Sequence, residues 1–252
     1  MENNFVNVTK IKFGEIPCLY IRPYSSEKGL PTVFLYHGWS SKKENYEFMG
    51  KIIALHGFQV IVPDSIKHGE RGQLDYEDLQ VMEQNFWEVA MSSVEEFKTI
   101  LKEGQEKLNM DPLKIAVMGH SMGGIISSGI FARNQNIRTL ITMNGACAWE
   151  DVEERIRAAR NVDRTTSISL EKLREYDPLQ LKDNFYPRPV LILHGEKDDS
   201  VPIESQLYFY DQVAEDYKER PENLKFSVLK NLTHHKTIGM LEEAIAWLKK
   251  HL

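Results

Sequence analysis

The stretch from Lys114 to Gly124, which reads KIAVMGHSMGG, decides the fold of this chain. Its first half is an uninterrupted apolar run, typical of a strand that is buried on both faces of a sheet. Its second half places Ser121 between Gly119 and Gly123, directly before a segment with helical character. Small residues suit a tight strand-to-helix turn, and serine is a common helix cap. The rest of the sequence must show whether Ser121 is only a cap.

Short β-branched and aromatic runs alternate with longer helical patterns along the chain. Buried strands are expected over residues 32–36, 58–62, 114–118, 139–143, 190–193 and 225–229. Helices are expected over about 44–57, 75–104, 122–134, 204–218 and 238–251. Antiparallel edge strands are expected at residues 5–8 and 16–21. This alternation predicts a single α/β domain over residues 1–252, with a mainly parallel sheet and helices on both faces.

One segment departs from this alternation. Residues from Gly145 to about Leu181 are charged and helix-prone, with Val152, Ile156 and Ala159 as a narrow apolar stripe. A single crossover helix needs fewer residues. We therefore expect a small cap at about residues 145–181, over the carboxyl edge of the sheet. Solvated decoration of the crossover is the alternative.

Composition limits the classes of function. The chain has 252 residues, a net charge of −6 and a sequence pI near 5.8, which give no electrostatic reason to bind nucleic acid or an anionic membrane. No segment approaches the roughly 18 apolar residues of a membrane span, and the first residues do not read as a signal peptide. We expect a soluble, cytoplasmic protein in which Cys18 and Cys147 are buried free thiols. The sequence carries no signal for an oligomeric state.

Polar residues follow almost every expected strand. In open parallel sheets, ligands bind at the carboxyl ends of the strands, so these residues are expected to share one edge. They lie at 37–40, at 64 and 67–72, at 119–124, at 194–199 and at 231–235. They include a serine, several acids and several histidines.

The spacing Gly119-x-Ser121-x-Gly123 is that of a nucleophile elbow, in which a strained turn exposes a serine hydroxyl. Bulky side chains at the two glycines would collide with neighbouring backbone. The helix that follows would favour developing negative charge at its N-terminus. Two phosphate-loop patterns fail, because the spacing is not G-x-G-x-x-G and no lysine follows the last glycine.

A serine hydroxyl needs a base, and the base needs an orienting acid. The chain order Ser121, then Asp198 or Asp199, then His234 or His235 is the order of this architecture. A metal site at His194, Asp198 and the two later histidines would lack helical ligand spacing and would leave Ser121 unexplained. No metal and no cofactor are expected.

With these motifs in place, the chain resembles the α/β-hydrolase superfamily over nearly its whole length. Within it, the chain is similar to small esterases related to dienelactone hydrolase and to the prolyl oligopeptidase catalytic domain. The segments that carry the resemblance are His37-Gly38-Trp39, residues 119–124, residues 194–202 and Thr233-His234. The resemblance implies Ser121 as nucleophile, Asp198 as acid and His234 as base, with Asp199 and His235 as the less favoured neighbours.

The resemblance also implies an oxyanion hole made by the backbone N–H groups of Trp39 and Met122. The Trp39 indole would shape the substrate pocket, unless it only packs, and Trp149 would close the pocket from above. His37 is expected to brace its loop, and His120 to pack beside the elbow. Glu70 and Arg71 follow an earlier strand, where an ion pair that holds the loop is favoured over a place at the pocket entrance.

The expected activity is that of a serine esterase, which cleaves small esters with short acyl groups through an acyl-enzyme on Ser121. The charged cap sequence from Glu150 to Arg164 argues against insertion into lipid. A peptidase or amidase of the prolyl oligopeptidase-like group is the first alternative, and a catalytically silent ligand-binding scaffold is the second. The expected partner is a small-molecule ester, with neither nucleic acid nor membrane.

Overall fold

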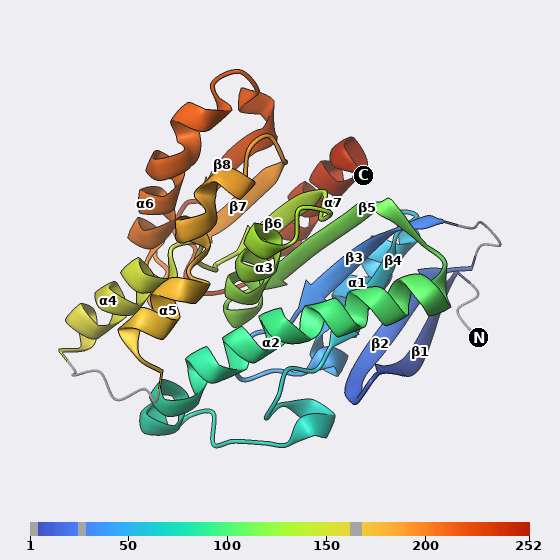
Figure 1. Cartoon of the computed structure of the whole chain (residues 1–252), viewed down its shortest axis with the longest axis horizontal. Coiled ribbons are helices and arrows are strands. Elements are labelled where there is room, and N and C mark those ends of the chain that lie inside the picture. The colour runs from blue at the N-terminus through green and yellow to red at the C-terminus, as the bar shows by residue number, and fades with distance from the viewer. Residues whose placement is uncertain (1–4, 25–28, 162–167) are drawn as a thin grey trace.

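A computed structural model describes residues 5–24, 29–161 and 168–252 of the chain. Its described part contains one open, eight-stranded sheet with the strand order β1-β2-β4-β3-β5-β6-β7-β8 (Figure 1). The strands are β1 (Val6–Phe13), β2 (Ile16–Pro23), β3 (Leu30–Tyr36), β4 (Gln59–Pro63), β5 (Met110–His120), β6 (Thr139–Met143), β7 (Val190–Gly195) and β8 (Leu224–Leu229). All neighbours from β4 to β8 pair in parallel, and β1 and β2 add an antiparallel edge, as predicted.

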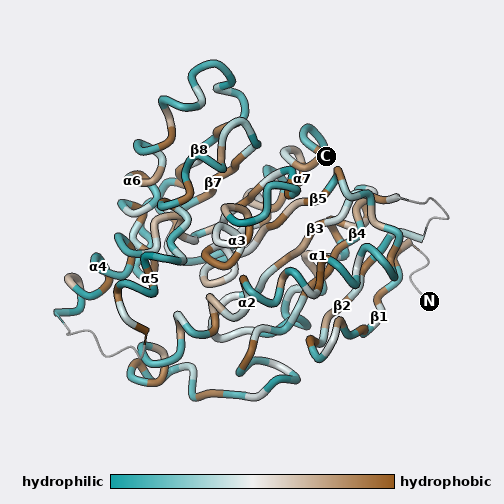
Figure 2. The backbone as a smooth tube through the Cα atoms, in the orientation of Figure 1, coloured by the Kyte–Doolittle hydropathy of each residue, from teal (hydrophilic) through white to brown (hydrophobic). Residues whose placement is uncertain are grey.

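Helices cover both faces of the sheet. The α-helices are α1 (Glu47–Leu55), α2 (Leu79–Leu108), α3 (Met122–Arg133), α4 (Trp149–Arg160), α5 (Leu170–Tyr176), α6 (Ile203–Val213) and α7 (Ile238–His251). Short 3-10 helices lie at Lys43–Tyr46, Gly69–Arg71, Pro178–Asn184, Ala214–Tyr217 and Pro221–Asn223. Figure 2 shows hydrophobic residues concentrated along the central strands and hydrophilic stretches along the outer elements.

Alternation along the strands separates the core into two layers. In β3, Val33 and Leu35 pack with α1 and α7, whereas Phe34 and Tyr36 pack with α2 and α3. Successive side chains of a strand point to opposite faces, so a strand buried on both faces is apolar at every position. The apolar runs in the sequence therefore mark the strands of a two-sided core.

The chain reverses direction across the sheet between β3 and β5. From β3 it continues to β4 on one side, then returns past β3 to β5 and onward through β6, β7 and β8. The helix after β3, α1, lies on one face, and the helix after β5, α3, lies on the other. The loops after these two adjacent strands diverge, which leaves a crevice at their carboxyl ends. This is the point at which Gly38 and Ser121 meet.

The boundaries differ from expectation in a few places. Strand β1 extends to Phe13, because it pairs along its whole length with β2, although its sequence alternates only weakly. The helix expected at 44–57 is a 3-10 turn followed by α1, and the one at 204–218 is α6 followed by another 3-10 turn. Packing of the tighter turns against the body overrides their local helical preference.

Helices α4 and α5 occupy the segment expected to form a cap. Their polar faces carry local ion pairs, with Arg155 Nε 2.7 Å from Asp151 Oδ2 and Arg174 Nε 2.8 Å from Glu150 Oε2. Residues 162–167 lie outside the described residues, including the acid and the arginine that the cap sequence places at 163 and 164.

Two further expectations concern membrane spans and thiols. Across the described ranges, none of the helices is both long and apolar enough to cross a membrane. Cys18 and Cys147 are both buried and free, as predicted. Burial raises the pKa of the Cys147 thiol to about 12, which keeps it protonated and unreactive.

Candidate active site

Ser121 occupies a strained turn between β5 and α3. Its φ of 57° and ψ of −127° lie in a region that side chains other than glycine rarely adopt. The turn is held by a hydrogen bond from the Ser121 N–H to the Met143 carbonyl oxygen, 2.9 Å away. The two flanking glycines allow it, because a Cβ at Gly119 would lie 2.3 Å from the Gly123 backbone and one at Gly123 would lie 2.1 Å from the Tyr36 carbonyl oxygen.

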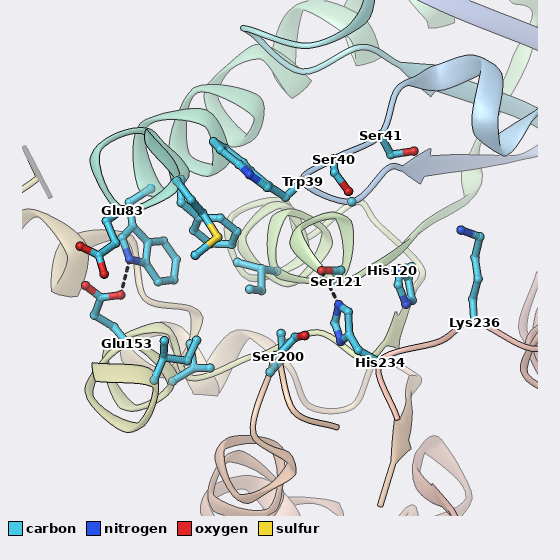
Figure 3. Close-up of a pocket in the computed structure, with 18 of the residues that line it drawn as sticks. Trp39, Ser40, Ser41, Glu83, His120, Ser121, Glu153, Ser200, His234 and Lys236 are labelled. Atoms are coloured by element: carbon cyan, nitrogen blue, oxygen red, sulfur yellow. Dashed lines mark hydrogen bonds between the residues drawn. The ribbon is translucent and has the colours of Figure 1, made fainter. Parts of the chain in front are cut away.

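The three residues predicted as nucleophile, base and acid lie within hydrogen-bond distance of one another. Ser121 Oγ is 2.8 Å from His234 Nε2 (Figure 3). His234 Nδ1 is 2.8 Å and 2.9 Å from the two carboxylate oxygens of Asp198. A carboxylate can only accept, so Nδ1 carries the proton and Nε2 is free to accept one from the serine hydroxyl. This arrangement can deprotonate Ser121 as its oxygen forms a new bond.

Asp198 is held ionised inside the protein. Its side chain is fully buried, and Oδ1 accepts hydrogen bonds from the Ser200 and Val201 N–H groups at 3.0 and 2.9 Å. His194 Nε2 lies 3.3 Å from Oδ2. Burial alone would raise the pKa of the Asp198 carboxyl, but the hydrogen bonds from the two histidines and from Val201 outweigh it and hold that pKa below its ordinary range. The Asp198 carboxylate therefore stays negatively charged beside His234 Nδ1, where it can stabilise a positively charged His234 ring.

The two less favoured neighbours point elsewhere. Asp199 is exposed and accepts a hydrogen bond from the Ser200 hydroxyl at 3.2 Å. His235 is exposed, with Nδ1 2.8 Å from the Thr233 hydroxyl. The structure brings Asp198 and His234, not these neighbours, to Ser121.

The two other histidines near the elbow have supporting positions. His37 is fully buried, accepts from the Ser65 N–H at Nε2 (3.1 Å) and therefore donates from Nδ1 to the Gly38 carbonyl oxygen (2.9 Å). It braces the loop after β3, as expected. The His120 ring lies 5.0 Å from the His234 ring. Burial lowers the pKa of His37 to about 4 and that of His120 to about 3, so both are weak bases at neutral pH.

Of the two residues expected to supply the oxyanion-hole N–H groups, Met122 directly follows Ser121, and Trp39 follows Gly38, where an added Cβ would lie 3.4 Å from Ser121 Cβ. The Met122 N–H opens α3 and has no partner within the helix, since the first amides of a helix are left over. Neither it nor the Trp39 N–H has an acceptor among residues 5–24, 29–161 and 168–252. The Trp39 side chain is buried, donates from its indole nitrogen to the Tyr76 carbonyl oxygen at 3.2 Å and lines the pocket.

A cavity of about 520 Å³ opens beside Ser121. Its apolar wall comes from the loop after β3 and from α2, α3 and α4, with side chains that include Trp39, Met82, Phe86, Trp87, Ile125, Val152 and Ile156. Its charged side chains are Glu83, Glu153, Arg157, Arg160 and Lys236. The sequence did not predict that α2 lines the cavity. An apolar helix face has the same sequence pattern whether it packs against a core or lines a cavity.

The expectation that Trp149 lines this pocket is wrong. Trp149 is completely buried, packs 5.3 Å from the Trp87 ring and donates from its indole nitrogen to the Ser128 hydroxyl at 3.1 Å. It is the first residue of α4, so it anchors that helix to α3. Val152 and Ile156, three and seven residues further along the helix, face the cavity instead.

Glu70 and Arg71 hold their loop and do not line the pocket. Glu70 Oε1 is 2.9 Å from the buried Lys43 ammonium. Arg71 pairs with Glu96 at 2.5 Å. The loop is therefore fixed by ion pairs, as favoured in the sequence, although the two residues pair with other partners and not with each other.

Comparison with known proteins agrees with this geometry. A model of the prolyl oligopeptidase family matches residues 47–252. The chain belongs to the prolyl oligopeptidase family. Family membership makes it a hydrolase with the α/β-hydrolase fold, as the sequence motifs predicted.

Two relatives with esterase names match this family member over nearly its whole length. YitV of Bacillus subtilis (strain 168), a candidate esterase by name, is 27% identical over 94% of this chain and 96% of its own. Esterase YjfP of Escherichia coli (strain K12) is 26% identical over 98% of this chain and 100% of its own. The crystal structure of TT1662 from Thermus thermophilus superposes with a TM-score of 0.78 at 19% identity and covers 97% of both chains. This last likeness shows the fold alone.

Proposed function

We propose that this protein is a serine carboxylesterase in which Ser121, His234 and Asp198 are the catalytic triad. The observation that carries the proposal is the 2.8 Å contact between Ser121 Oγ and His234 Nε2 beside a cavity of about 520 Å³. A buried, ionised Asp198 on the far side of the imidazole supports it. The cavity falls within the roughly 300–1,000 Å³ of ordinary small-molecule sites.

The reaction has two halves. His234 Nε2 takes the Ser121 proton as Oγ attacks the ester carbonyl carbon, and the tetrahedral intermediate expels the alkoxide, which receives that proton as an alcohol. The acyl group is left on Ser121. A water molecule then gives a proton to His234, attacks the same carbon and releases the acid, and the proton returns to Ser121. Asp198 stays ionised throughout and stabilises the imidazolium.

The negative oxygen of each tetrahedral intermediate needs preorganised donors. We assign this role to the N–H groups of Trp39 and Met122, which have no acceptor in the described part of the chain. The positive end of α3 adds to their effect. Removal of one such donor typically costs 10²–10³-fold in kcat in other enzymes of this kind.

The segment that contains α4 and α5 is proposed to be a cap on the cavity. Val152 and Ile156 of α4 supply part of the apolar wall, and Trp149 fixes the helix from beneath. The outward face is charged, which disfavours a lid that opens onto lipid. We infer a preference for small, water-soluble esters and, from the composition, a cytoplasmic location.

Labelling with a fluorophosphonate probe tests the proposal directly. The wild-type protein is expected to react covalently at one residue, identified as Ser121 by peptide mass spectrometry, and to release p-nitrophenol from p-nitrophenyl acetate. The Ser121→Ala variant is expected to do neither. Absence of labelling with an intact, folded wild-type protein would reject the serine-hydrolase mechanism and leave the silent scaffold.

A peptidase or amidase is the second candidate, because Glu83 and Glu153 line the cavity at the end away from His120 and Lys236 (Figure 3). A carboxylate there would attract a peptide amine. Glu153 is already engaged by the Trp87 indole at 2.9 Å and by Arg157 at 2.7 Å, which favours the esterase. Parallel assays on alanine p-nitroanilide and alanine p-nitrophenyl ester separate the two, with hydrolysis of the anilide at a comparable kcat/KM as the outcome that would favour a peptidase.

A further inference from the structure

The cavity is polar at one end. Lys236 lines it on the loop after β8, two residues beyond His234. Figure 3 places Lys236 and His120 together on one side of Ser121, with Ser40 and Ser41 bordering the same region, whereas Glu83 and Glu153 lie at the opposite end. The apolar side chains of α2 and α4 also lie toward that opposite end. The two halves of an ester bound at Ser121 would therefore meet different surroundings.

The Lys236 ammonium has a cation–π contact but no carboxylate partner in the described part of the chain. It lies 4.7 Å from the centre of the Tyr46 ring. Within the described ranges, no acidic side chain is within ion-pair distance of it. Lys236 is exposed as a whole residue, but partial removal of its ammonium from water lowers its pKa, and no acid of the described ranges compensates. The other charged side chains of the cavity include Glu153 and Arg157, which neutralise each other.

We propose that Lys236 binds an anionic group, a carboxylate or a phosphate, on the alcohol part of the ester. The proposal rests on the esterase function proposed above. In that reaction His234 protonates the leaving oxygen, so the alcohol part lies on the His234 side, where Lys236 follows on the same loop. The Ser41 hydroxyl and the Asn45 amide line the same cavity and add neutral donors for the oxygens of such a group.

Paired substrates test this assignment. We would measure kcat/KM for 4-acetoxybenzoate and for its uncharged analogue 4-acetoxybenzamide, and take the ratio of the two for each variant so that intrinsic reactivity cancels. Lys236→Met is expected to lower the anionic-to-neutral ratio about tenfold, the order expected for one charge-assisted hydrogen bond. The matched control Lys42→Met, which changes an exposed lysine outside the cavity lining, is expected to keep the ratio within about twofold.

The outcomes separate this inference from the function on which it rests. An unchanged ratio in Lys236→Met, or an equal fall in Lys42→Met, would overturn the assignment of Lys236 while leaving the esterase intact. If no ester is cleaved and no fluorophosphonate label appears, both proposals fall together. A third substrate, 4-acetoxyphenyl phosphate, carries a phosphate in place of the carboxylate. The anion that Lys236 favours is the one whose substrate loses more kcat/KM in Lys236→Met.

A different observation concerns the alignment of the triad. Asn144 follows β6, is completely buried and has a left-handed φ of 48°. Its side-chain oxygen accepts a hydrogen bond from the Gly195 N–H at 2.9 Å. Its side-chain nitrogen donates to the carbonyl oxygens of His235 at 3.3 Å and Thr233 at 3.5 Å. Gly195 begins the loop that carries Asp198, and the other two residues flank His234.

The two loops joined by Asn144 also touch directly. A Cβ at Gly195 would lie 2.5 Å from the Leu232 carbonyl oxygen, and the Lys197 N–H donates to that same oxygen at 2.8 Å. We infer that Asn144 is a positioning residue, whose amide fixes the acid loop and the histidine loop relative to each other. It touches neither the substrate nor the reacting atoms. Its effect would pass through the distance between Asp198 and His234.

Asn144→Gly removes the amide while keeping a backbone that glycine adopts freely. We expect kcat for p-nitrophenyl acetate to fall roughly 10–100-fold, the order that small misplacements of catalytic groups cost, with KM changed less than threefold. The control Asn109→Gly changes another left-handed asparagine, at the end of α2, and is expected to keep the wild-type kcat. Wild-type kcat in Asn144→Gly, or an equal loss in Asn109→Gly, would overturn the inference.

A second variant covers the case in which Asn144→Gly does not fold. Asn144→Asp keeps the acceptor toward the Gly195 N–H and replaces the donor toward the histidine loop with an oxygen. We expect a fall in kcat at unchanged KM in the folded protein, as judged by its thermal unfolding. Full activity in Asn144→Asp would show that the donor half of the amide does no positioning.

Discussion

Two ionisable clusters, each with a fully buried carboxylate, lie at the carboxyl edge of the same sheet, and of the two only the second lines the cavity beside Ser121. The first consists of Lys43, Asp64 and Glu70, and we call it the ion-pair cluster. Lys43 Nζ is 2.5 Å from Asp64 Oδ2 and 2.9 Å from Glu70 Oε1, and Asp64 also accepts from the Lys43 and Glu70 N–H groups at 2.9 and 3.1 Å. The second is the candidate triad of Ser121, His234 and Asp198.

The two clusters differ in whether they leave a polar group free to contact a ligand. The ammonium of the ion-pair cluster has a side-chain exposure of 0% and is surrounded by acids, so nothing is left for a ligand. In the triad, Asp198 is equally buried, but Ser121 and His234 both line the cavity. A buried ionisable cluster therefore indicates chemistry only where one member reaches a cavity. The ion-pair cluster should affect stability, and the triad should affect rate.

The largest effect is expected from Ser121→Ala. Loss of the nucleophile should reduce kcat on the order of 10⁶-fold, as removal of the serine does in a comparable triad enzyme, with little change in the free energy of unfolding. The matched control is Ser127→Ala, a buried serine of α3 whose hydroxyl donates to the Gly123 carbonyl oxygen at 2.7 Å. Its loss should cost about 1 kcal/mol of stability and leave the rate near wild type. More than a few per cent residual activity in Ser121→Ala would rule out the elbow serine as nucleophile.

The triad and its sequence neighbours should differ sharply. Asp198→Asn is expected to lower kcat about 10⁴-fold, the size of the analogous change in another serine hydrolase, and His234→Ala should be at least as severe. Asp199→Asn and His235→Ala should stay within a few fold, because both side chains are exposed and face away from Ser121. Steady-state assays on p-nitrophenyl acetate measure all four. If the neighbours were the severe variants, the triad would shift by one residue.

The ion-pair cluster should show the opposite pattern. Lys43→Met leaves the Asp64 carboxylate buried without its cation, which typically costs about 3–5 kcal/mol of unfolding free energy. Urea denaturation measures the loss, with Lys42→Met as the exposed control, expected within about 0.5 kcal/mol. The folded fraction of Lys43→Met should lose far less kcat than Asp198→Asn. Equal losses of kcat in these two variants would erase the distinction between the clusters.

Changing the pH should also separate the two clusters. Hydrogen bonds from Lys43 and Lys10 lower the pKa of the Glu70 carboxyl to about 2. A lowered carboxyl pKa contributes stability above its unfolded value near 4.3, and this is lost only as the pH falls toward about 2. The proposed mechanism needs a neutral imidazole as base, so the rate of ester hydrolysis should fall on the acidic side of neutrality. Activity should therefore fall at pH 6, before the ion-pair cluster loses its contribution to stability. The melting temperature of the whole protein should also decrease there, because His37 and His120 are neutral in the folded protein and take up protons on unfolding. A flat rate profile to pH 5 would argue against a histidine base.

Much of this arrangement could be read from the sequence. The apolar strand runs predicted the fold. The glycines around Ser121 and the chain order of acid and histidine predicted that Ser121, His234 and Asp198 come together. Each of these signals depends on residues that are close in the sequence. Trp149, Asn144 and Lys236 could not be placed in this way. Whether a tryptophan faces a core or a cavity, and which loops an asparagine joins, depends on packing between segments far apart in the chain. The ion-pair cluster followed the same pattern of polar residues after a strand, so sequence alone did not distinguish it from the triad.

The smallest effect is expected from the length of the acyl group. Each methylene that the apolar wall buries favours binding by up to about 0.8 kcal/mol, so kcat/KM should rise a few fold per carbon until the wall is filled. Glu153 lies at the end of the cavity away from Lys236 (Figure 3) and pairs with Arg157 at 2.7 Å, so a longer chain that reaches this end would have to displace or desolvate the pair.

We therefore expect a maximum at roughly two to six acyl carbons, by our estimate from ordinary pocket sizes, and no increase in rate where the substrate forms micelles. A series of p-nitrophenyl esters from acetate to palmitate measures this. Val152→Ala provides the sharper variant, because it enlarges the apolar wall without touching the triad and should move the maximum to longer chains. A wild-type maximum at ten carbons or more would mean that the paired charges move aside, and α4 would then behave as a lipase lid and not as a fixed wall.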